Sequence, residues 1–216
     1  DEGLRAQHLD DGGDPYQRQL IRGYTEYQAA CERGGMVDFA ELLLRAHELW
    51  RERPDILQHY QARFQHVLVD EFQDTNAIQY AWLRLLTSEH NNLFIVGDDD
   101  QSIYGWRGAR VENIQSFQQD YHKTQLVRLE QNYRSSGSIL DAANALITHN
   151  AARLGKRLWT ADGEGGPIYL YAAFNEVDEA RFVVERIRQA IEGGQRASEL
   201  AILYRTTAQS RLFEEA

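Results

Sequence analysis

Short apolar runs that end abruptly in polar clusters recur along this 216-residue chain, and stretches of helical periodicity separate them. The runs expected to form strands are 67–69, 93–96, 125–129, 168–171 and 200–204. Helical patterns occur at 78–86, 139–150 and 176–191. Alternation of strands and helices predicts a parallel sheet with helices on its faces, and the β-branched run 67–69 is typical of a buried strand. The expected fold class is therefore α/β.

The first 64 residues have a different pattern. From residue 16 to residue 64 the periodicity is helical throughout, with stops indicated at Gly34 and before Pro54. Asp38 and Glu41 form a capping-box signature at the start of the middle helix. An all-helical segment ahead of an α/β region indicates a separate or inserted subdomain.

Composition and charge restrict the class of protein. The chain is 43% hydrophobic and 11% aromatic, which is ordinary for a globular protein. It has no apolar run near the ~20 residues that a membrane span requires and no signal-peptide pattern, so no membrane association is expected. The single Cys31 excludes an intrachain disulfide and favours a reducing, cytoplasmic location. A net charge of −10 argues against binding nucleic acid mainly by phosphate neutralisation, but it permits binding of single strands by base stacking.

Both ends of the sequence have the features of an internal piece. There is no initiator methionine, since the first methionine is Met36. The chain stops at Ala216 within an amphipathic pattern and without a capping residue. We therefore expect a fragment of a longer protein.

Asp70 and Glu71 directly follow the apolar run 67–69. In open α/β sheets, ligands bind beyond the carboxyl ends of the strands. P-loop ATPases use an apolar strand that ends in Asp-Glu: the Asp holds Mg²⁺ and the Glu polarises the attacking water. The structural alternative is a solvated strand end followed by an Asp N-cap.

The segment 97–108 is a loop with three glycines, three adjacent carboxylates and two aromatic rings. The carboxylates at 98–100 repel one another and cost stability unless other groups organise them. Tyr104 and Trp106 lie two residues apart, which suits a helix core poorly, and beside Arg107 they could stack on bases. The alternative is that both rings pack back onto the core.

Tyr133 and Arg134 follow the expected strand 125–129 and precede a Ser-capped helix. An arginine at this place could bind a nucleotide phosphate with two parallel hydrogen bonds, and the tyrosine could stack on a base. The alternative is a solvated arginine beside a helix cap.

Three segments resemble helicase motifs II, III and IV. They read Asp-Glu-Phe-Gln-Asp-Thr at 70–75, Gly-Asp-Asp-Asp-Gln-Ser-Ile-Tyr-Gly-Trp-Arg-Gly-Ala at 97–109, and Leu-Glu-Gln-Asn-Tyr-Arg-Ser at 129–135. The chain is similar to superfamily-one DNA helicases of the UvrD/Rep/PcrA branch from about residue 16 onward. Residues 37–49 and 201–216 are most similar to the UvrD group of that branch.

The resemblance implies a nucleotide site for ATP and Mg²⁺. By that similarity, Asp70 would position Mg²⁺, Glu71 would activate water, and Gln101 would sense the γ-phosphate. Tyr133 would stack on the adenine, and Arg134 would act as an arginine finger.

The resemblance also implies a DNA site. Tyr104 and Trp106 would stack on bases of the tracking strand, while Arg107 would contact DNA and Arg205 would touch its backbone. Thr207 stands where the family pattern has Asn, which places the DNA contact of that position in doubt. A nucleotide sensor and a stacking pair on one short loop would couple hydrolysis to strand movement.

The architecture implied is a pair of RecA-like lobes that close on ATP and move 3′→5′ along single-stranded DNA. Residues 1–64 would be the helical remnant of an inserted domain. Residues 65–130 would form the C-terminal part of the first lobe, and residues 131–216 the N-terminal part of the second. Expected partners are single-stranded DNA, DNA junctions and repair proteins, with the protein acting in DNA repair and replication as a monomer or weak dimer.

The phosphate-binding signature Gly-x-x-x-x-Gly-Lys-[Ser/Thr] is absent from the sequence. We expect that loop upstream, so the 216-residue piece alone should neither hydrolyse ATP nor unwind DNA. Three alternatives remain: a helicase–nuclease subunit of the recombination type, a degenerate DNA-binding module without catalysis, and a purely structural α/β domain. Intact Asp70, Glu71, Gln101 and Arg134 argue against degeneration. Burial of both loop rings would favour the structural domain.

Overall fold

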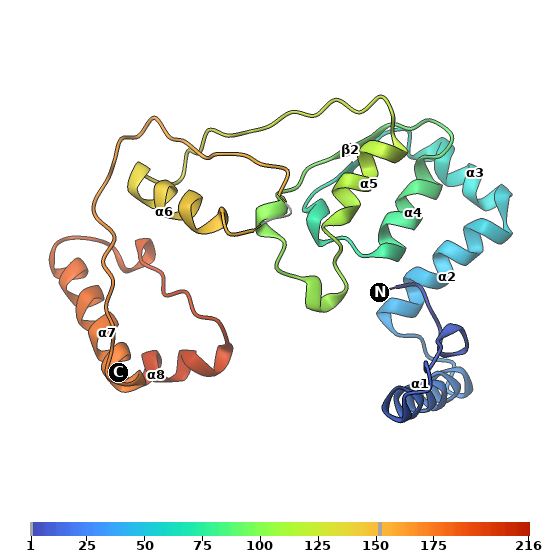
Figure 1. Cartoon of the computed structure of the whole chain (residues 1–216), viewed down its shortest axis with the longest axis horizontal. Helices are drawn as coiled ribbons and strands as arrows, with labels where there is room; N and C mark the ends of the chain where they lie inside the picture. The colour runs from blue at the N-terminus through green and yellow to red at the C-terminus, as the bar shows by residue number, and fades with distance from the viewer. Residues whose placement is uncertain (1, 151–152) are drawn as a thin grey trace. The chain divides into compact units, whose positions relative to one another are not determined.

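The computed structural model describes residues 2–150 and 153–216, and it divides the chain into two compact units (Figure 1). The first unit comprises residues 1–132 and 143–159, and the second comprises 133–142 and 160–216. Within the described residues, no helix combines the length and apolar character needed to cross a bilayer.

The first unit contains most of the regular structure. Its helices are α1 (Pro15–Arg33), α2 (Phe39–Glu52), α3 (Pro54–Arg63), α4 (Ala77–Thr87) and α5 (Glu112–Asp120). Its strands are β1 (Val67–Val69) and β2 (Leu93–Ile95). Three 3₁₀ turns matter below: η2 (Phe72–Asp74), η3 (Asp99–Gln101) and η4 (Gly105–Arg107). The boundary between the units passes through α6 (Gly137–Ile147).

The strands β1 and β2 pair in parallel, with Leu68 opposite Phe94, and α4 connects them. Backbone bonding continues past the strands: the Val96 N–H donates to the Val69 carbonyl at 2.8 Å, and the Phe72 N–H donates to the Val96 carbonyl at 2.9 Å. The carboxyl ends of the two strands therefore meet at one edge of the sheet, as the sequence predicts.

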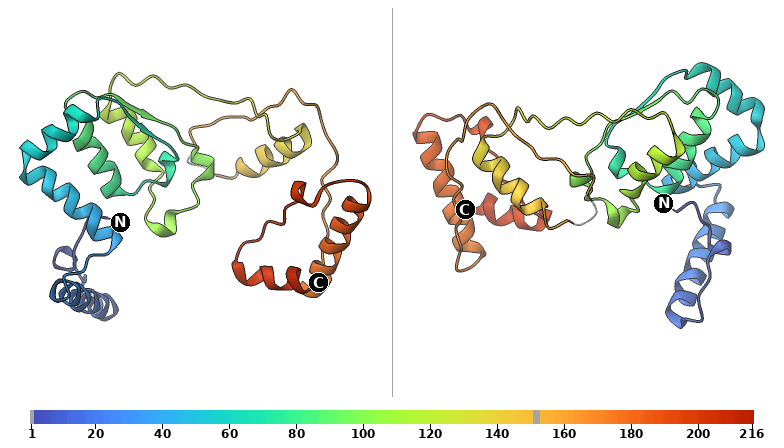
Figure 2. Two further views of the ribbon diagram at one scale, coloured as in Figure 1. Left: turned by 180° about the vertical axis from the view of Figure 1, so that it is seen from behind. Right: turned by 45° about the horizontal axis from the view of Figure 1, so that its top comes forward.

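The core of the first unit lies between α4, α5 and the sheet. Figures 1 and 2 show α4 and α5 side by side. The buried cluster consists of Phe72, Tyr80, Leu83, Ile114 and Phe117. The Phe72 ring meets the rings of Tyr80 and Phe117 edge to face, at centroid distances of 5.6 and 5.8 Å. Phe72, immediately after Glu71, is fully buried and anchors the polar strand end to this core.

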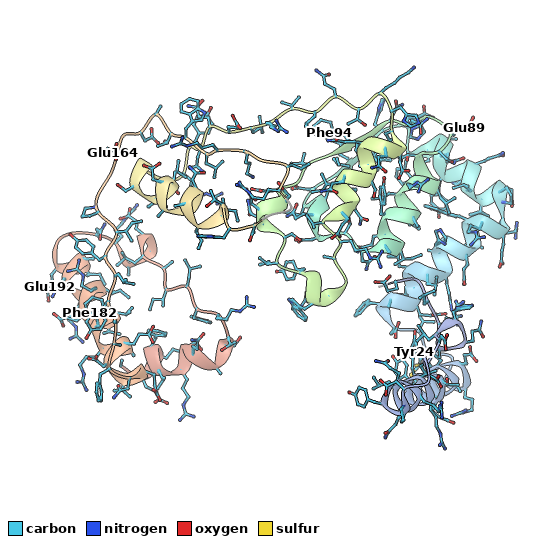
Figure 3. The ribbon with its side chains drawn as sticks, viewed as in Figure 1. Tyr24, Glu89, Phe94, Glu164, Phe182 and Glu192 are labelled. Carbon is cyan, nitrogen blue, oxygen red and sulfur yellow. The ribbon has the colours of Figure 1, made fainter. Side chains whose placement is uncertain are left out.

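One face of the sheet is covered and the other is open. Val67, Val69, Leu93 and Ile95 pack against the core cluster, while Leu68 and Phe94 (labelled in Figure 3) are exposed. The strand predicted at 67–69 is therefore buried on one face only. The prediction of a buried strand is wrong for the face that carries Leu68. The described helices lie against a single face, and successive side chains of a strand point to opposite faces.

The helical character predicted for residues 16–64 is confirmed in α1, α2 and α3. The Asp38 carboxylate accepts the Glu41 N–H at 2.8 Å, which is one half of the predicted capping box. The Glu41 carboxylate accepts instead from Arg5 at 2.9 Å and from Arg45 at 2.7 Å. The rings of Trp50 and Trp82 stack at 4.5 Å and join α2 to α4.

Three of the predicted strands are absent from the described structure: 125–129, 168–171 and 200–204 are irregular chain. Each has the apolar composition of a strand, but a strand requires a hydrogen-bonded neighbour. The described residues supply no such ladder, and Leu129, Leu170 and Leu203 are exposed. The predicted α/β class is therefore present as helices together with a two-stranded parallel sheet that is covered on one face.

The second unit contains α7 (Glu176–Glu192) and α8 (Ser210–Glu215). The side chain of Asn175 caps α7 by accepting the Asp178 N–H at 2.9 Å. The rings of Tyr171 and Phe182 (labelled in Figure 3) stack at 3.8 Å. The helix predicted at 176–191 is therefore confirmed as α7.

Candidate functional site

The turn at Asp70 and Glu71 has an unusual backbone. The Asp70 Oδ1 accepts the Glu71 N–H at 2.9 Å, and Glu71 adopts φ 49° and ψ 43°. This left-handed conformation costs a residue other than glycine roughly 1–2 kcal/mol. Burial of Phe72 and its backbone bond to Val96 hold the turn in place. Both carboxylates are exposed at the end of β1, where a ligand of an α/β sheet binds.

Gln73 connects the ends of the two strands. Its side chain is 1% exposed. The Nε2 donates to Glu71 Oε2 at 2.6 Å, and the Oε1 accepts the Asp98 N–H at 3.0 Å. A Cβ on Gly97 would lie 2.9 Å from that Oε1, so glycine at 97 leaves room for the amide.

Asp98 extends this connection to the loop. Its Oδ2 accepts the Gln101 Nε2 at 2.7 Å, and its Oδ1 accepts the Asp100 N–H at 3.0 Å and pairs with the Lys156 ammonium. Glu71, Gln73, Asp98 and Gln101 thus form one continuous chain of hydrogen bonds, called here the Glu71–Gln101 network. It joins two residues predicted to work on the same nucleotide.

The charge of Asp98 is stabilised within this network. Burial alone would raise the pKa of its carboxyl. Hydrogen bonds from Lys156 and Gln101, together with the positive charge of Lys156, outweigh burial and hold that pKa below its ordinary value. Asp98 is therefore an ionised acceptor at neutral pH.

Basic residues far along the sequence organise the three adjacent carboxylates. Arg153 binds Asp100 through two parallel hydrogen bonds, each 2.6 Å long, and the Leu154 N–H donates to Asp99 Oδ2 at 2.7 Å. The oxygens of the three aspartates lie within 4.8 Å of one another, but Arg153 pairs with Asp100, Lys156 pairs with Asp98, and Asp99 accepts the Leu154 N–H. We assign no metal to this cluster.

Tyr104, Trp106 and Arg107 lie together on the loop and form one aromatic and cationic surface. The two ring centroids are 6.5 Å apart, and the Arg107 guanidinium lies 5.3 Å from the Tyr104 centroid and 4.6 Å from the Trp106 centroid. Trp106 is 73% exposed and Tyr104 is 37% exposed. These exposures count against the alternative in which both rings fill the core.

The far end of the loop is also bonded to the segment after Glu71. The Arg110 N–H donates to the Thr75 carbonyl at 2.9 Å. The buried Asn113 amide donates to the same carbonyl at 3.0 Å and to Thr75 Oγ1 at 3.1 Å. The loop between Asp98 and Arg110 is therefore held to one segment, residues 71–75, at both ends.

The predicted site residues divide between the two units. The first unit contains Asp70, Glu71, Gln101, Tyr104, Trp106 and Arg107, and the second contains Tyr133, Arg134 and Arg205. Tyr133 is 78% exposed, and Arg134 and Arg205 are also exposed. The Arg205 N–H donates to Gln209 Oε1 at 2.9 Å, and Thr207 begins a 3₁₀ turn (Thr207–Gln209).

Sequence reasoning missed three residues of this site. Gln73 lies inside the motif at 70–75, and its place two residues after Glu71 is the signal in the sequence that could identify it. Arg153 and Lys156 were also missed, although three adjacent carboxylates require cations. Their separation from the loop, 53 residues between Asp100 and Arg153, hides the pairing in the sequence.

Comparisons with known proteins match the helicase family that the sequence motifs indicate. The model of the UvrD/REP helicase N-terminal domain matches residues 1–122, and that of the UvrD-like helicase C-terminal domain matches residues 127–216. DNA helicase II of Escherichia coli is 61% identical over all 216 residues, and DNA helicase II of Haemophilus influenzae is 55% identical over the same length. The ATP-dependent DNA helicase PcrA of Leuconostoc citreum is 48% identical over 202 residues, which is 93% of this chain and 27% of that protein.

The chain spans 30% of the length of the two DNA helicase II relatives, so the match concerns one part of a longer type of protein. The two family models together cover nearly the whole chain. The chain therefore belongs to the UvrD/REP helicase family.

Proposed function

We propose that this chain is part of an ATP-driven DNA helicase that moves 3′→5′ along single-stranded DNA. The observation that carries the proposal is the Glu71–Gln101 network on a loop that also exposes Trp106. The carboxylate that would activate water is thereby bonded, through Gln73, to Asp98 on the loop that exposes the rings proposed to stack on bases. Such a connection lets a change at the nucleotide alter the position of the rings.

The donor set at the end of β1 fits ATP with Mg²⁺. Asp70 is an exposed carboxylate, and oxygen ligands of this kind are those that Mg²⁺ prefers. Asp70 would hold the ion, which neutralises phosphate charge when bound. Glu71 would orient and deprotonate water, Gln101 would bind the γ-phosphate, and Arg134 would stabilise charge on the transferred phosphoryl group. Tyr133 would stack on the adenine.

The exposed rings fit single-stranded DNA better than a duplex. A net charge of −10 is unsuited to binding that depends on phosphate neutralisation, whereas stacking on Tyr104 and Trp106 tolerates it. Arg107, and Arg205 in the second unit, would add backbone contacts. Single-stranded DNA, DNA junctions and repair proteins are the proposed partners of a cytoplasmic protein in DNA repair and replication, acting as a monomer or weak dimer.

Two RecA-like lobes are the proposed architecture of the complete motor. Residues 65–130 would belong to the first lobe and residues 131–216 to the second, with residues 1–64 in an inserted domain. The sequence contains no phosphate-binding loop of the Gly-x-x-x-x-Gly-Lys-[Ser/Thr] type, so the isolated 216-residue chain would be inactive.

The proposal is tested by ATP hydrolysis in the full-length protein, with and without single-stranded DNA. We expect DNA to stimulate the wild type strongly and Glu71→Gln to lower kcat by roughly 10²–10⁴-fold, because the amide cannot accept a proton from water. Glu89→Gln, an exposed carboxylate after α4, is the matched control and should hydrolyse ATP like the wild type. Hydrolysis indifferent to DNA would contradict the stacking role, and strong hydrolysis by the isolated chain would contradict its proposed inactivity.

A further inference from the structure

Gln73 is a buried amide whose two functional atoms both face the candidate site. The Nε2 donates to the Glu71 carboxylate at 2.6 Å, and the Oε1 accepts the Asp98 N–H at 3.0 Å. Its side chain is 1% exposed, while Glu71 is exposed. The buried Gln73 amide thus holds the exposed Glu71 side chain by a hydrogen bond.

A second buried glutamine in the same unit shows the contrast. Gln61 is 6% exposed, and its Nε2 donates to the Leu85 carbonyl at 2.9 Å and to Ser88 Oγ at 3.0 Å. Those bonds tie α3 to the end of α4 and reach no residue of the site. Burying either amide is costly unless it is hydrogen-bonded, so both glutamines contribute to folding. Gln73 alone directs its donor at a carboxylate with a chemical role.

We propose that Gln73 is a positioning residue that sets the orientation of the Glu71 carboxylate and connects it to Asp98 and the Gln101 loop. This inference rests on the proposed function, because the orientation matters only if Glu71 acts on water. Without the amide, the Glu71 side chain gains rotational freedom, and the Asp98 N–H loses its acceptor. Both changes reduce the fraction of molecules in which Glu71 and Gln101 are placed for the same nucleotide.

Gly97 provides an independent way to disturb the same amide. A Cβ at this position would approach Gln73 Oε1 to 2.9 Å and the Phe72 Cβ to 3.4 Å. Gly97→Ala therefore pushes the amide from its place and leaves Gln73 and Glu71 chemically intact. A loss of rate in this variant would arise from geometry alone.

The experiment measures steady-state ATP hydrolysis by the full-length protein at saturating single-stranded DNA. We expect Gln73→Leu to lower kcat about 10- to 100-fold, the range found when a side chain that orients a metal ligand is removed. The KM for ATP should stay within about threefold of the wild type, because binding of the nucleotide does not require the orientation of Glu71. Gln61→Leu is the matched control: it should lose comparable thermal stability and retain the wild-type kcat.

A double-mutant cycle separates positioning from general destabilisation. In a Glu71→Gln background, Gln73→Leu should lower the residual kcat by a clearly smaller factor than in the wild type, because the carboxylate it orients has been removed and only the loss of the Asp98 contact remains. Gly97→Ala should lower kcat in the wild type and have little further effect in Gln73→Leu. Two results would overturn the positioning role. One is that Gln73→Leu lowers kcat by the same factor in the wild type and in Glu71→Gln. The other is that Gln61→Leu lowers kcat as much as Gln73→Leu does.

The results that contradict the proposed function differ from those that contradict the positioning role of Gln73. If the wild type shows no DNA-stimulated hydrolysis, the proposed function is wrong. If the wild type is stimulated and Glu71→Gln is inactive, but Gln73→Leu and Gly97→Ala keep the wild-type kcat, only the role of Gln73 is wrong. Should Gln73→Leu fail to fold, Gly97→Ala carries the test by the same criteria.

Discussion

At the scale of single residues, the site depends on a strained turn held by its neighbours. Glu71 occupies a left-handed conformation that residues other than glycine rarely adopt, and it lies between exposed Asp70 and fully buried Phe72. Strain of this kind persists where surrounding contacts determine the backbone. The strand end is thus shaped to present a carboxylate, at a cost that the Phe72 core contacts offset.

The exposed ring of Trp106 should contribute directly to the binding of single-stranded DNA. Each base stacked on an aromatic side chain contributes ~1–3 kcal/mol, so Trp106→Ala should weaken single-stranded DNA binding by about 5- to 150-fold. Trp106→Phe keeps a ring and should recover most of the affinity. Fluorescence anisotropy with a labelled oligonucleotide, in the absence of nucleotide, measures the effect.

Phe39→Ala is the control for this measurement. Phe39 begins α2 and is even more exposed than Trp106, but it lies outside the candidate site. Its removal should leave DNA affinity unchanged. If Trp106→Ala binds DNA as Phe39→Ala does, the stacking surface is not a DNA contact.

At the scale of elements, the loop at 98–101 is held by a distant segment, residues 153–156. Asp100 pairs with Arg153, Asp98 with Lys156, and the Leu154 N–H donates to Asp99. The loop lies in the region matched by the N-terminal family model, and its cations lie in the region matched by the C-terminal one. The stability of this loop therefore depends on both matched regions.

The lowered pKa of Asp98 predicts how this contact responds to pH. A carboxyl whose pKa is lower in the folded than in the unfolded state stabilises the fold above its ordinary pKa, and this contribution is lost as the pH falls through the lowered value. Asp98→Asn should therefore be less stable than the wild type at pH 7, by roughly 1–3 kcal/mol for hydrogen bonds to a charged group. The difference should shrink as the pH falls below the ordinary aspartate range.

Urea unfolding of both proteins at neutral and acid pH measures this difference. Asp55→Asn is the control, since Asp55 pairs with Arg53 on an exposed surface where ion pairs contribute little. If the difference in unfolding free energy between wild type and Asp98→Asn stays constant across this pH range, the lowered pKa of Asp98 is not its cause.

At the scale of the whole molecule, apolar side chains remain uncovered in the segments expected to be strands. Leu129, Leu170 and Leu203 are each at least 80% exposed. Exposed apolar segments that lack a partner are sites of association. In the longer relatives, additional chain is available to cover equivalent segments.

The isolated 216-residue chain should therefore bind the dye ANS more strongly, per mole, than the full-length protein. Its sedimentation coefficient should also rise with concentration, because unpaired apolar segments associate. Leu170→Ser should reduce both effects, whereas Ala161→Ser, on a nearby exposed position without a large apolar side chain, should not. Weak dye binding and concentration-independent sedimentation would show that these segments are covered.

Features that depend on contacts between neighbouring residues follow from the amino-acid sequence alone. Periodicity located α1 to α4 and α7, and capping residues such as Asp38 and Asn175 act within one turn of their helices. The two short apolar runs before Asp70 and Gly97 predicted β1, β2 and their common polar edge. The motifs predicted the family for the same reason, because each lies within a few consecutive residues.

Features that depend on partners distant in the sequence follow only from the three-dimensional fold. The network through Gln73 requires the ends of β1 and β2 to meet, and the pairing of Asp100 with Arg153 closes a separation of 53 residues. The runs 125–129, 168–171 and 200–204 have the propensity of strands without becoming strands. Local propensity favours an extended backbone, but a strand exists only where a second backbone supplies its hydrogen bonds.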